Sequence, residues 1–491
     1  MIVANLPALQ VIIPLLCAPF CLMLRWNWYV YGVALVASWC AFVVSLALLD
    51  VVLTSGPISY RLGGWAPPWG IEYAVDSVNA YVLLIVSAIG ALVITFGKKS
   101  VEHELPIGKD GLFYTSYLLC LAGLLGVTIT GDAFNIFVFL EISSLSSYIL
   151  ISLGRQPRAL TAAYRYLVLG TIGATFYLIG VGLLYQATGT LNIADLADRV
   201  SEVSDSRAVR AAFGFMTVGL GIKLALFPLH IWLPNAYAYA PSVSSAFLAA
   251  TATKVSVYVL IRVFFTIFGP AYSFGSMPLD MVLLPLAVAA MFVGSLVAIF
   301  QVDVKRMLAY SSVAQIGYMI IGICLASVLG LTGGLLHLFN HALMKGALFL
   351  AMGCVVYRLG SVLLEDLSGL GHRMPWTMAA FVVGGLSLIG IPLTAGFVSK
   401  WYLILGALDK DWWWLAALIL LSSLLAIIYV WRIIEVAYLR PAPEGSEAQE
   451  APLSLLIPTW VLALANIYFG IDTRISVGVA ETAASFLLGM S

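Results

Sequence analysis

The chain has 491 residues, of which 62% are hydrophobic and only 10% carry a formal charge. Globular chains average roughly 45–50% apolar and about 25% charged residues, and a soluble protein needs polar groups to cover its surface. This composition therefore excludes a soluble globular protein and predicts an integral membrane protein. The 24 Lys and Arg residues balance the 24 Asp and Glu residues, so the net charge does not indicate a nucleic acid as a partner.

Apolar stretches long enough to cross about 30 Å of hydrocarbon as helices recur along the whole chain. We expect an all-α membrane protein with about fourteen transmembrane helices in a single polytopic domain, residues 1–491. The first stretch lacks a basic segment and a small-residue cleavage site, which indicates a retained span and not a signal peptide. The expected spans are 5–25, 29–53, 77–97, 111–130, 132–153, 163–187, 210–238, 241–268, 279–301, 307–329, 331–358, 376–406, 412–436 and 453–470.

Spans 7 and 12 are expected to be broken at mid-depth. Pro228, Pro234 and Pro241 follow one another closely in the seventh, and Pro392 precedes Gly396 in the twelfth. A proline removes a backbone donor and clashes with the preceding turn, and broken helices in a membrane must be buried or line a wet cavity. Their positions predict two inverted five-helix repeats, an arrangement typical of transporters. The repeats would form two half-channels, residues 110–268 and 279–436.

The polar connections suggest an orientation. Loops from odd to even spans carry about twice as many Lys and Arg residues as the loops from even to odd spans. We assign Arg262 to the loops from even to odd spans. We count Lys305 among the loop charges of the richer side. The imbalance predicts cytoplasmic odd-to-even loops and two extracytoplasmic termini. Of the longer polar segments, 189–210 is expected to hold an interfacial helix and 441–452 to form a loop.

A few titratable residues fall inside the apolar stretches, where solvation by loop water does not explain them. A charge at the bilayer centre costs from about 2.5 to more than 10 kcal/mol, so such residues are expected to be paired, hydrated or functional. Alternatives are an ion pair that only fixes helix packing, and lysines bonded to backbone carbonyls. The candidate site residues are Glu141, Lys223, Lys254, Lys345, Lys400, His230, His337 and His341.

Glu141 lies about ten residues into the fifth span, and we expect it to face Lys223. Burial disfavours the charged form of a lysine, whereas a nearby carboxylate favours it, so the pair is suited to a switch. Beyond Lys223 the break frees backbone groups, which together with His230 can hold water. Lys254 lies about 20 Å along the next helix, which is mid-membrane. Hydroxyl residues flank it, as a water-lined face requires.

His337, His341 and Lys345 are spaced by four residues and are expected to form one stripe on a helix. A zinc-peptidase helix would need a glutamate beside the first histidine, and Leu338 stands there. Proton relay fits better, because imidazole titrates near neutral pH and can pass a proton through either nitrogen. We expect no metal and no cofactor, and interpret the six cysteines as buried apolar residues. In the preceding span, Ser311, Gln315 and Tyr318 share one face.

Four segments between residues 111 and 410 resemble one membrane family: GIKLALFPLHIWLPNAYAYAPSVSSAFLAATATKVSVYVLIR, DVKRMLAYSSVAQIGYMIIG, HALMKGALFLAMG and GIPLTAGFVSKW. This is the proton-antiporter-like family, shared by large subunits of Mrp-type multisubunit Na⁺/H⁺ antiporters, the membrane arms of respiratory complex I and related hydrogenases. Length and the segment HIWLPNAYAYAPSVSSAFL are most similar to the D subunits of Mrp antiporters.

The resemblance implies a role for each buried group. Glu141 and Lys223 match the ion pair of the first half-channel, and Lys254 matches a bridging lysine. Lys400 matches the terminal group of the second half-channel, where one complex I homologue has glutamate. The remaining three match a central relay: His337, His341 and Lys345.

We therefore expect a proton-translocating subunit of a cation/H⁺ antiporter in a bacterial or archaeal cell membrane, assembled with other membrane subunits. The alternatives are a proton-pumping subunit of a redox complex, a self-sufficient carrier, and a structural scaffold with relic charges. A sodium site needs several oxygen ligands, and Glu141 is the one acid that we place at mid-membrane, with Asp132 near the start of the same span as its expected neighbour. The sequence therefore supports proton handling better than sodium binding.

Overall fold

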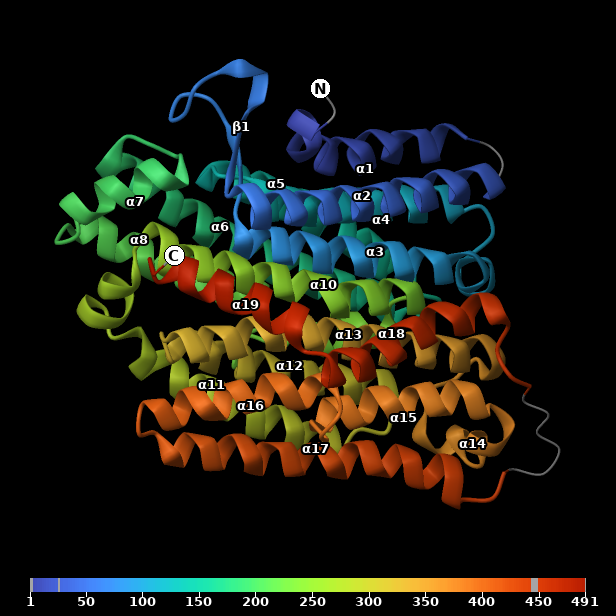
Figure 1. Cartoon of the computed structure of the whole chain (residues 1–491). Helices are drawn as coiled ribbons and strands as arrows, with labels where there is room; N and C mark the ends of the chain where they lie inside the picture. The colour runs from blue at the N-terminus through green and yellow to red at the C-terminus, as the bar shows by residue number, and fades with distance from the viewer. Residues whose placement is uncertain (1–2, 25–26, 443–448, 491) are drawn as a thin grey trace.

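The computed structural model describes residues 3–24, 27–442 and 449–490, and its long helices run nearly parallel to one another (Figure 1). Within these residues, twelve helices are long and apolar enough to cross a membrane. They are α1 (Leu6–Met23), α2 (Asn27–Ser55), α3 (Ser77–Glu104), α4 (Asp110–Ile129), α5 (Ala133–Ser152), α6 (Arg158–Thr188), α10 (Ser242–Ile261), α11 (Leu279–Ile299), α12 (Val304–Cys324), α13 (Val328–Leu359), α17 (Trp413–Leu439) and α18 (Leu453–Ile471).

Two further crossings are each made of two half-helices, which confirms the predicted breaks. The first consists of α8 (Arg207–Lys223) and α9 (Leu233–Tyr239), the second of α15 (Pro375–Ile389) and α16 (Ala395–Asp409). Left-handed residues mark the breaks: φ is 60° at Ala225 and 72° at Leu393. With the twelve continuous helices, these crossings make up the expected fourteen spans.

Short elements complete the described chain. β1 (Ile58–Arg61) pairs antiparallel with β2 (Glu72–Val75) in a hairpin after α2. The predicted interfacial helix is α7 (Ile193–Glu202). Of the predicted loop 441–452, residues 443–448 lie outside the described residues. The other short elements are η1 (Val3–Asn5), η2 (Leu62–Gly64), η3 (Arg262–Ile267), η4 (Ala271–Ser276), η5 (Leu364–Leu367), α14 (Leu370–Arg373) and α19 (Arg474–Leu487).

The connections after α3, α5, α11, α13 and α17 lie at one end of the bundle, at the right in Figure 1. We call this end the basic face, since it carries Lys99, Lys109 and Arg158. Both ends of the described chain lie towards the opposite end. The Tyr60 hydroxyl of the hairpin donates a hydrogen bond to Asn5 at 2.9 Å, and α19 ends beside the same hairpin. Which side of the membrane each end faces stays a prediction.

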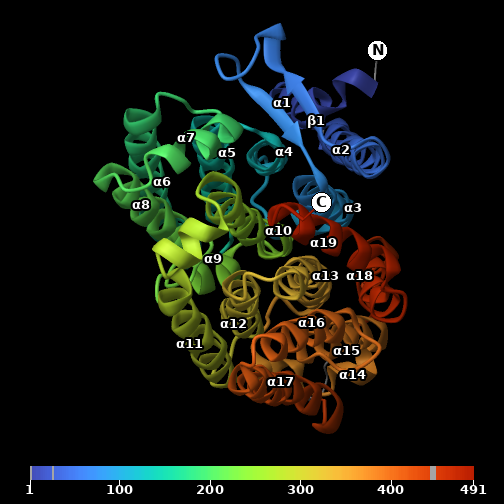
Figure 2. The same ribbon diagram turned by 60° about the vertical axis from the view of Figure 1, so that its left-hand side comes forward.

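The two repeats run in opposite directions. The first comprises α4, α5, α6, α8/α9 and α10, and begins at the basic face. The second comprises α11, α12, α13, α15/α16 and α17, and begins at the opposite end. Figure 2 shows the two sets side by side, with α10 of the first set next to α12 and α13 of the second. The molecule therefore has the inverted-repeat arrangement that the broken helices predicted.

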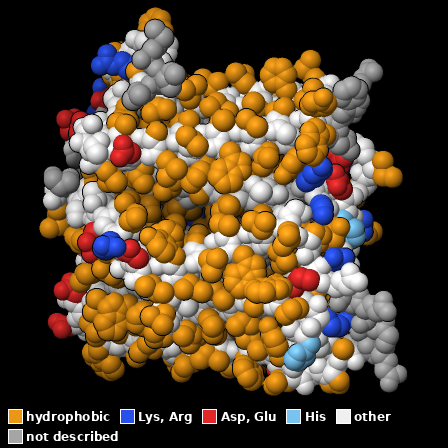
Figure 3. All heavy atoms as spheres, turned by 45° about the vertical axis from the view of Figure 1, so that its right-hand side comes forward, with side chains coloured by type: hydrophobic (Ala, Val, Ile, Leu, Met, Phe, Trp, Pro, Cys, Tyr) orange, Lys and Arg blue, Asp and Glu red, His pale blue; other side chains and the backbone are white. Residues whose placement is uncertain are grey.

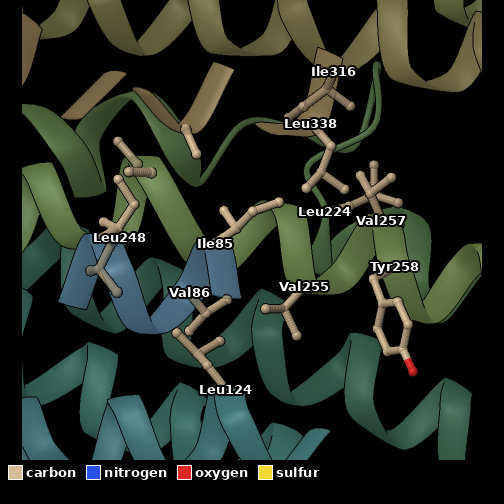
Figure 4. Packing of buried hydrophobic residues seen from close by; sticks show 14 of the residues in the cluster. Ile85, Val86, Leu124, Leu224, Leu248, Val255, Val257, Tyr258, Ile316 and Leu338 are labelled. Carbon is tan, nitrogen blue, oxygen red and sulfur yellow. The ribbon is translucent and has the colours of Figure 1, made fainter. Parts of the chain in front are cut away.

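The core lies around α10, which is buried almost along its whole length. Figure 4 shows Val255 of α10 pointing towards Val86 of α3 and Leu124 of α4, while Val257 points to the opposite side, near Leu338 of α13. The face that Figure 3 shows is hydrophobic over a broad middle band, and its charged side chains lie mainly towards the two edges. This is the distribution that a bilayer requires of a multi-pass membrane protein.

Candidate functional site

The first buried pair joins α5 to α8. The ammonium of Lys223 donates to Glu141 Oε1 at 3.1 Å and to Ser144 Oγ at 2.7 Å. The Lys223 side chain is 2% exposed, whereas that of Glu141 is 22% exposed. Lys223 is also the last residue of α8, where the helix dipole favours a positive charge. The structure thus places Glu141 opposite Lys223, as the sequence predicts.

The break after Lys223 has its own hydrogen bonds. Trp232 Nε1 donates to the carbonyl of Ile222 at 2.9 Å, so one of the freed carbonyls is satisfied. His230 lies in the break, half-buried, and its Nδ1 has no hydrogen-bond partner among the described residues. Its ring centroid lies 6.3 Å from that of Tyr310 on α12, so His230 sits between the repeats.

Lys254 is fully buried in the middle of α10. Its ammonium donates to the backbone carbonyl of Ala249 and, at 3.4 Å, to Thr253 Oγ1. The expected water-lined hydroxyl face is only partly present, because Thr251 and Ser256 donate to carbonyls of their own helix. Within residues 3–24, 27–442 and 449–490, Lys254 has no ion pair with an acidic side chain.

The predicted stripe on α13 faces α12 and α16. Lys345 donates to the Leu308 carbonyl at 2.7 Å and to Ser311 Oγ at 2.5 Å. His337 contacts Ser399 Oγ through Nδ1 and Gln315 Oε1 through Nε2, both at 2.9 Å. With the Gln315 amide in this orientation, Nε2 donates to Gln315 Oε1, while the Ser399 hydroxyl is also placed to donate to the Gly396 carbonyl at 3.1 Å.

His341 lies one turn from His337, and their rings are nearly parallel with centroids 6.2 Å apart. Neither ring nitrogen of His341 has a hydrogen-bond partner in the part of the chain that the structure describes, although the residue is fully buried. A buried imidazole without a partner is costly, and such groups commonly have a functional reason or hold a water molecule. His341 is thus free to accept or donate a proton.

Lys400 occupies the second break. Its ammonium donates to the carbonyls of Leu388 at 3.2 Å and Ile389 at 2.8 Å, and to Ser423 Oγ at 3.0 Å. Leu388 and Ile389 end α15, so Lys400 binds the negative end of a half-helix. The predicted likeness to Lys223 therefore holds for position but not for partner, since Lys400 binds carbonyls and Lys223 binds a carboxylate.

One face of α12 connects these groups. Ser311 contacts Lys345, Gln315 contacts His337, and the ring centroid of Tyr318 lies 4.9 Å from the Lys400 ammonium. Seven residues of α-helix separate Ser311 from Tyr318, which corresponds to about 10 Å. The three polar residues that share a face in the sequence thus each contact a different titratable group.

Three expectations about charged residues are wrong. Asp132 does not join Glu141 but caps α5 by accepting from the Asn135 backbone N–H at 2.7 Å. Lys305 is not a solvated loop charge, because it is 3% exposed on α12. Arg262 is likewise buried, and it forms an ion pair with Asp76 at 2.6 Å.

Sequence reasoning did not place Lys305, Arg262 or Glu104 among the buried groups, because each lies at the end of an apolar run. From the sequence, such a residue cannot be distinguished from a solvated one. Among the described residues, no group of three or more His, Cys, Asp or Glu side chains is arranged to hold a metal ion.

Comparisons with known proteins identify the family of this chain. The family described as NADH:quinone oxidoreductase/Mrp antiporter, TM matches residues 130–426. A NADH-quinone oxidoreductase subunit N from Desulforudis audaxviator is 43% identical, covering 95% of this chain and 96% of the relative. The D subunit of the Na⁺/H⁺ antiporter from Bacillus subtilis is 31% identical, covering 99% and 97%. A chain of the Mrp complex from Dietzia superposes with a TM-score of 0.90 at 27% identity, covering 99% and 98%. The chain therefore belongs to the family of membrane subunits that NADH:quinone oxidoreductase and the Mrp antiporter share.

Proposed function

We propose that the chain is a proton-translocating subunit of a multisubunit Na⁺(cation)/H⁺ antiporter. One observation carries the proposal. Four lysines are 5% exposed or less, and within the described residues only one of the four, Lys223, forms an ion pair with a carboxylate. The four are Lys223, Lys254, Lys345 and Lys400. Charging all four at once would place several uncompensated charges in hydrocarbon, at a cost of at least about 2.5 kcal/mol each. These lysines are therefore suited to take up and release protons in turn.

The order of contacts supports a path across the bundle. We place the ends at Glu141–Lys223 and at Lys400, with Lys254, His341 and Lys345 between them. Glu141 is partly exposed, so its carboxylate can turn away from Lys223 and release the ammonium to pass its proton inward. Each unit charge that crosses the membrane is worth about 2.3 kcal/mol per 100 mV. A membrane potential can therefore shift the occupancy of each lysine.

We assign the first half-channel to residues 110–268 and the second to 279–436, with the basic face on the cytoplasmic side. The relatives named as antiporter subunits and the Mrp complex support other membrane subunits as partners. Sodium is better assigned to another subunit, since Asp132 caps α5 and leaves Glu141 without a second carboxylate from that helix.

Replacement of Lys223 tests the proposal. In membrane vesicles that contain the assembled complex, Lys223→Ala is expected to abolish Na⁺-dependent dissipation of a pH gradient, because the ion pair with Glu141 is lost. Assembly is checked by native gel electrophoresis, and Lys109→Ala, on the exposed basic face, is the control. Full exchange activity by assembled Lys223→Ala would refute the assignment.

A second function deserves a test because one relative, 43% identical, is named as a subunit of NADH-quinone oxidoreductase. In that case the same lysines would pump protons in response to electron transfer elsewhere in the complex. Affinity purification of the complex from its own host, with mass spectrometry of its subunits, separates the two. Co-purified flavin or iron–sulfur subunits would favour the redox complex, and further antiporter subunits would favour the first function.

A further inference from the structure

A cavity of about 410 Å³ opens at the basic face, where the two repeats meet. The first repeat contributes Arg155 and the segment 238–241, while the second contributes the start of α12 and the end of α13. Glu104 and Lys305 line the cavity, although they are only 7% and 3% exposed. Neither belongs to the lysine path described above.

Ser242 joins these two charged groups. Glu104 Oε2 accepts from the Ser242 backbone N–H at 2.9 Å and from its hydroxyl at 3.0 Å. The Lys305 ammonium donates to Ser242 Oγ at 3.0 Å and to the Ala240 carbonyl at 3.4 Å. The hydroxyl thus donates to the carboxylate while it accepts from the ammonium, which is the arrangement that a proton relay requires.

Four other charged side chains line the cavity: Arg155, Arg158, Asp303 and Arg306. Arg155 donates through Nε to the backbone carbonyl of Glu104 at 3.1 Å. Asp303 accepts from the backbone N–H of Arg306 at 2.8 Å and so caps α12. Ser100 Oγ donates to the second carboxylate oxygen, Glu104 Oε1, at 2.5 Å. Glu104 and Lys305 therefore face each other across one hydroxyl and not in direct contact.

The cluster also lies close to the central lysine. Leu308, whose carbonyl accepts from Lys345, follows Lys305 by three residues, and Ser311 follows it by six. These offsets correspond to about 4.5 and 9 Å along α12. The four-carbon stem of a lysine reaches about 6 Å, so the Lys305 side chain spans the offset to Leu308 but not the offset to Ser311. The polar face of α12 thereby extends to the basic face.

We propose that Glu104, Ser242 and Lys305 form a proton port that connects the cavity at the basic face with Lys345. Neutral Lys305 takes the hydroxyl proton of Ser242 while the Ser242 oxygen takes the proton of the Glu104 carboxylic acid. The products are the Lys305 ammonium, an intact Ser242 hydroxyl and the Glu104 carboxylate. Glu104 then regains a proton from cavity water, and Lys305 passes its proton to Lys345. The port rests on the proposed function, because it supplies the same relay.

Substitutions of Ser242 test the port, since they leave both charges in place. In vesicles with the assembled complex, Ser242→Ala is expected to slow Na⁺/H⁺ exchange roughly tenfold or more, as loss of a positioned proton-transfer group does. Ser242→Thr keeps the hydroxyl and is expected to retain most of the rate. The matched control is Ser244→Ala, on the same helix and equally buried, whose hydroxyl donates to the Leu150 carbonyl at 3.3 Å.

Equal rates for Ser242→Ala and Ser244→Ala would overturn the port, and so would equal losses for Ser242→Ala and Ser242→Thr. If Ser242→Ala fails to assemble, Glu104→Gln and Glu104→Asp replace it. The first is expected to lose the rate and the second to keep it, and equal rates would overturn the port. Lys345→Ala separates the two proposals. If the Lys345→Ala complex still exchanges ions, the proposed function is wrong. If the Lys345→Ala complex is inactive while the Ser242→Ala complex is active, only the port is wrong.

Discussion

The four lysines of the proposed path differ most in what holds their charged form. Lys223 has a carboxylate and a hydroxyl, and Lys400 has two helix-end carbonyls and a hydroxyl. Lys345 has one carbonyl and one hydroxyl, and Lys254 has a carbonyl with a distant hydroxyl. Because partners that carry negative charge stabilise an ammonium, the proton is held best at the two ends of the path.

Glu141→Gln tests the end at Lys223. The substitution removes an attraction on the order of 2–4 kcal/mol, so the charged form of Lys223 becomes less accessible and Na⁺/H⁺ exchange is expected to fall at least roughly tenfold. Glu141→Asp is expected to restore part of the rate. The control is Glu435→Gln, whose side chain is 41% exposed beside Arg440. Unchanged exchange in the assembled Glu141→Gln complex would show that the pair only fixes helix packing.

At the scale of elements, both half-helix breaks bring a lysine to the negative end of a half-helix. Lys223 ends α8 itself, whereas Lys400 reaches back from α16 to the end of α15. In the second break, Gly390 caps α15 with φ of 89°, and a Cβ there would lie 2.9 Å from Lys400 Cδ. The Lys400 side chain therefore packs so closely against Gly390 that a larger residue at this position would collide with it.

Gly390→Ala tests this arrangement. The left-handed backbone costs a residue with a side chain about 1–2 kcal/mol, and the new methyl group must displace Lys400. We expect a lower thermal midpoint and slower exchange. Gly182→Ala is the control, because Gly182 is exposed within α6 and nothing lies within 4 Å of its added Cβ. An unchanged midpoint and rate in Gly390→Ala would mean that the break can shift without consequence.

At the scale of the whole molecule, the apolar runs and the clustered prolines were sufficient to predict fourteen spans, both breaks and the inverted order. The candidate lysines followed as well, because a charge in mid-span has few explanations. Lys305, Arg262 and Glu104 could not be placed in the same way. They stand at helix ends, and only the packing of distant segments decides whether a helix end meets water. The contacts of Lys400 could not be predicted from the sequence either, because two of its partners are backbone carbonyls, which every residue has.

Arg262 shows what a buried charged side chain at a helix end contributes to the packing of the bundle. Its guanidinium contacts both oxygens of Asp76 at 2.6 Å and donates to the Tyr258 hydroxyl at 2.9 Å, which in turn donates to the Thr128 carbonyl. Asp76 also caps α3 by accepting from the Val78 backbone N–H. The pair thus ties α3 to the far end of the first repeat, beside the hairpin.

Arg262→Met is therefore expected to destabilise the complex by about 3–5 kcal/mol, because it leaves the buried carboxylate of Asp76 unpaired. The double variant Asp76→Asn, Arg262→Met removes the charge but keeps an oxygen to cap α3, so it should recover most of the loss. Thermal unfolding of the purified complex measures both, with Arg474→Met as a control on an exposed pair. A double variant no more stable than Arg262→Met would mean that the arginine acts through its contact with Tyr258, and that the ion pair itself adds little to the bundle.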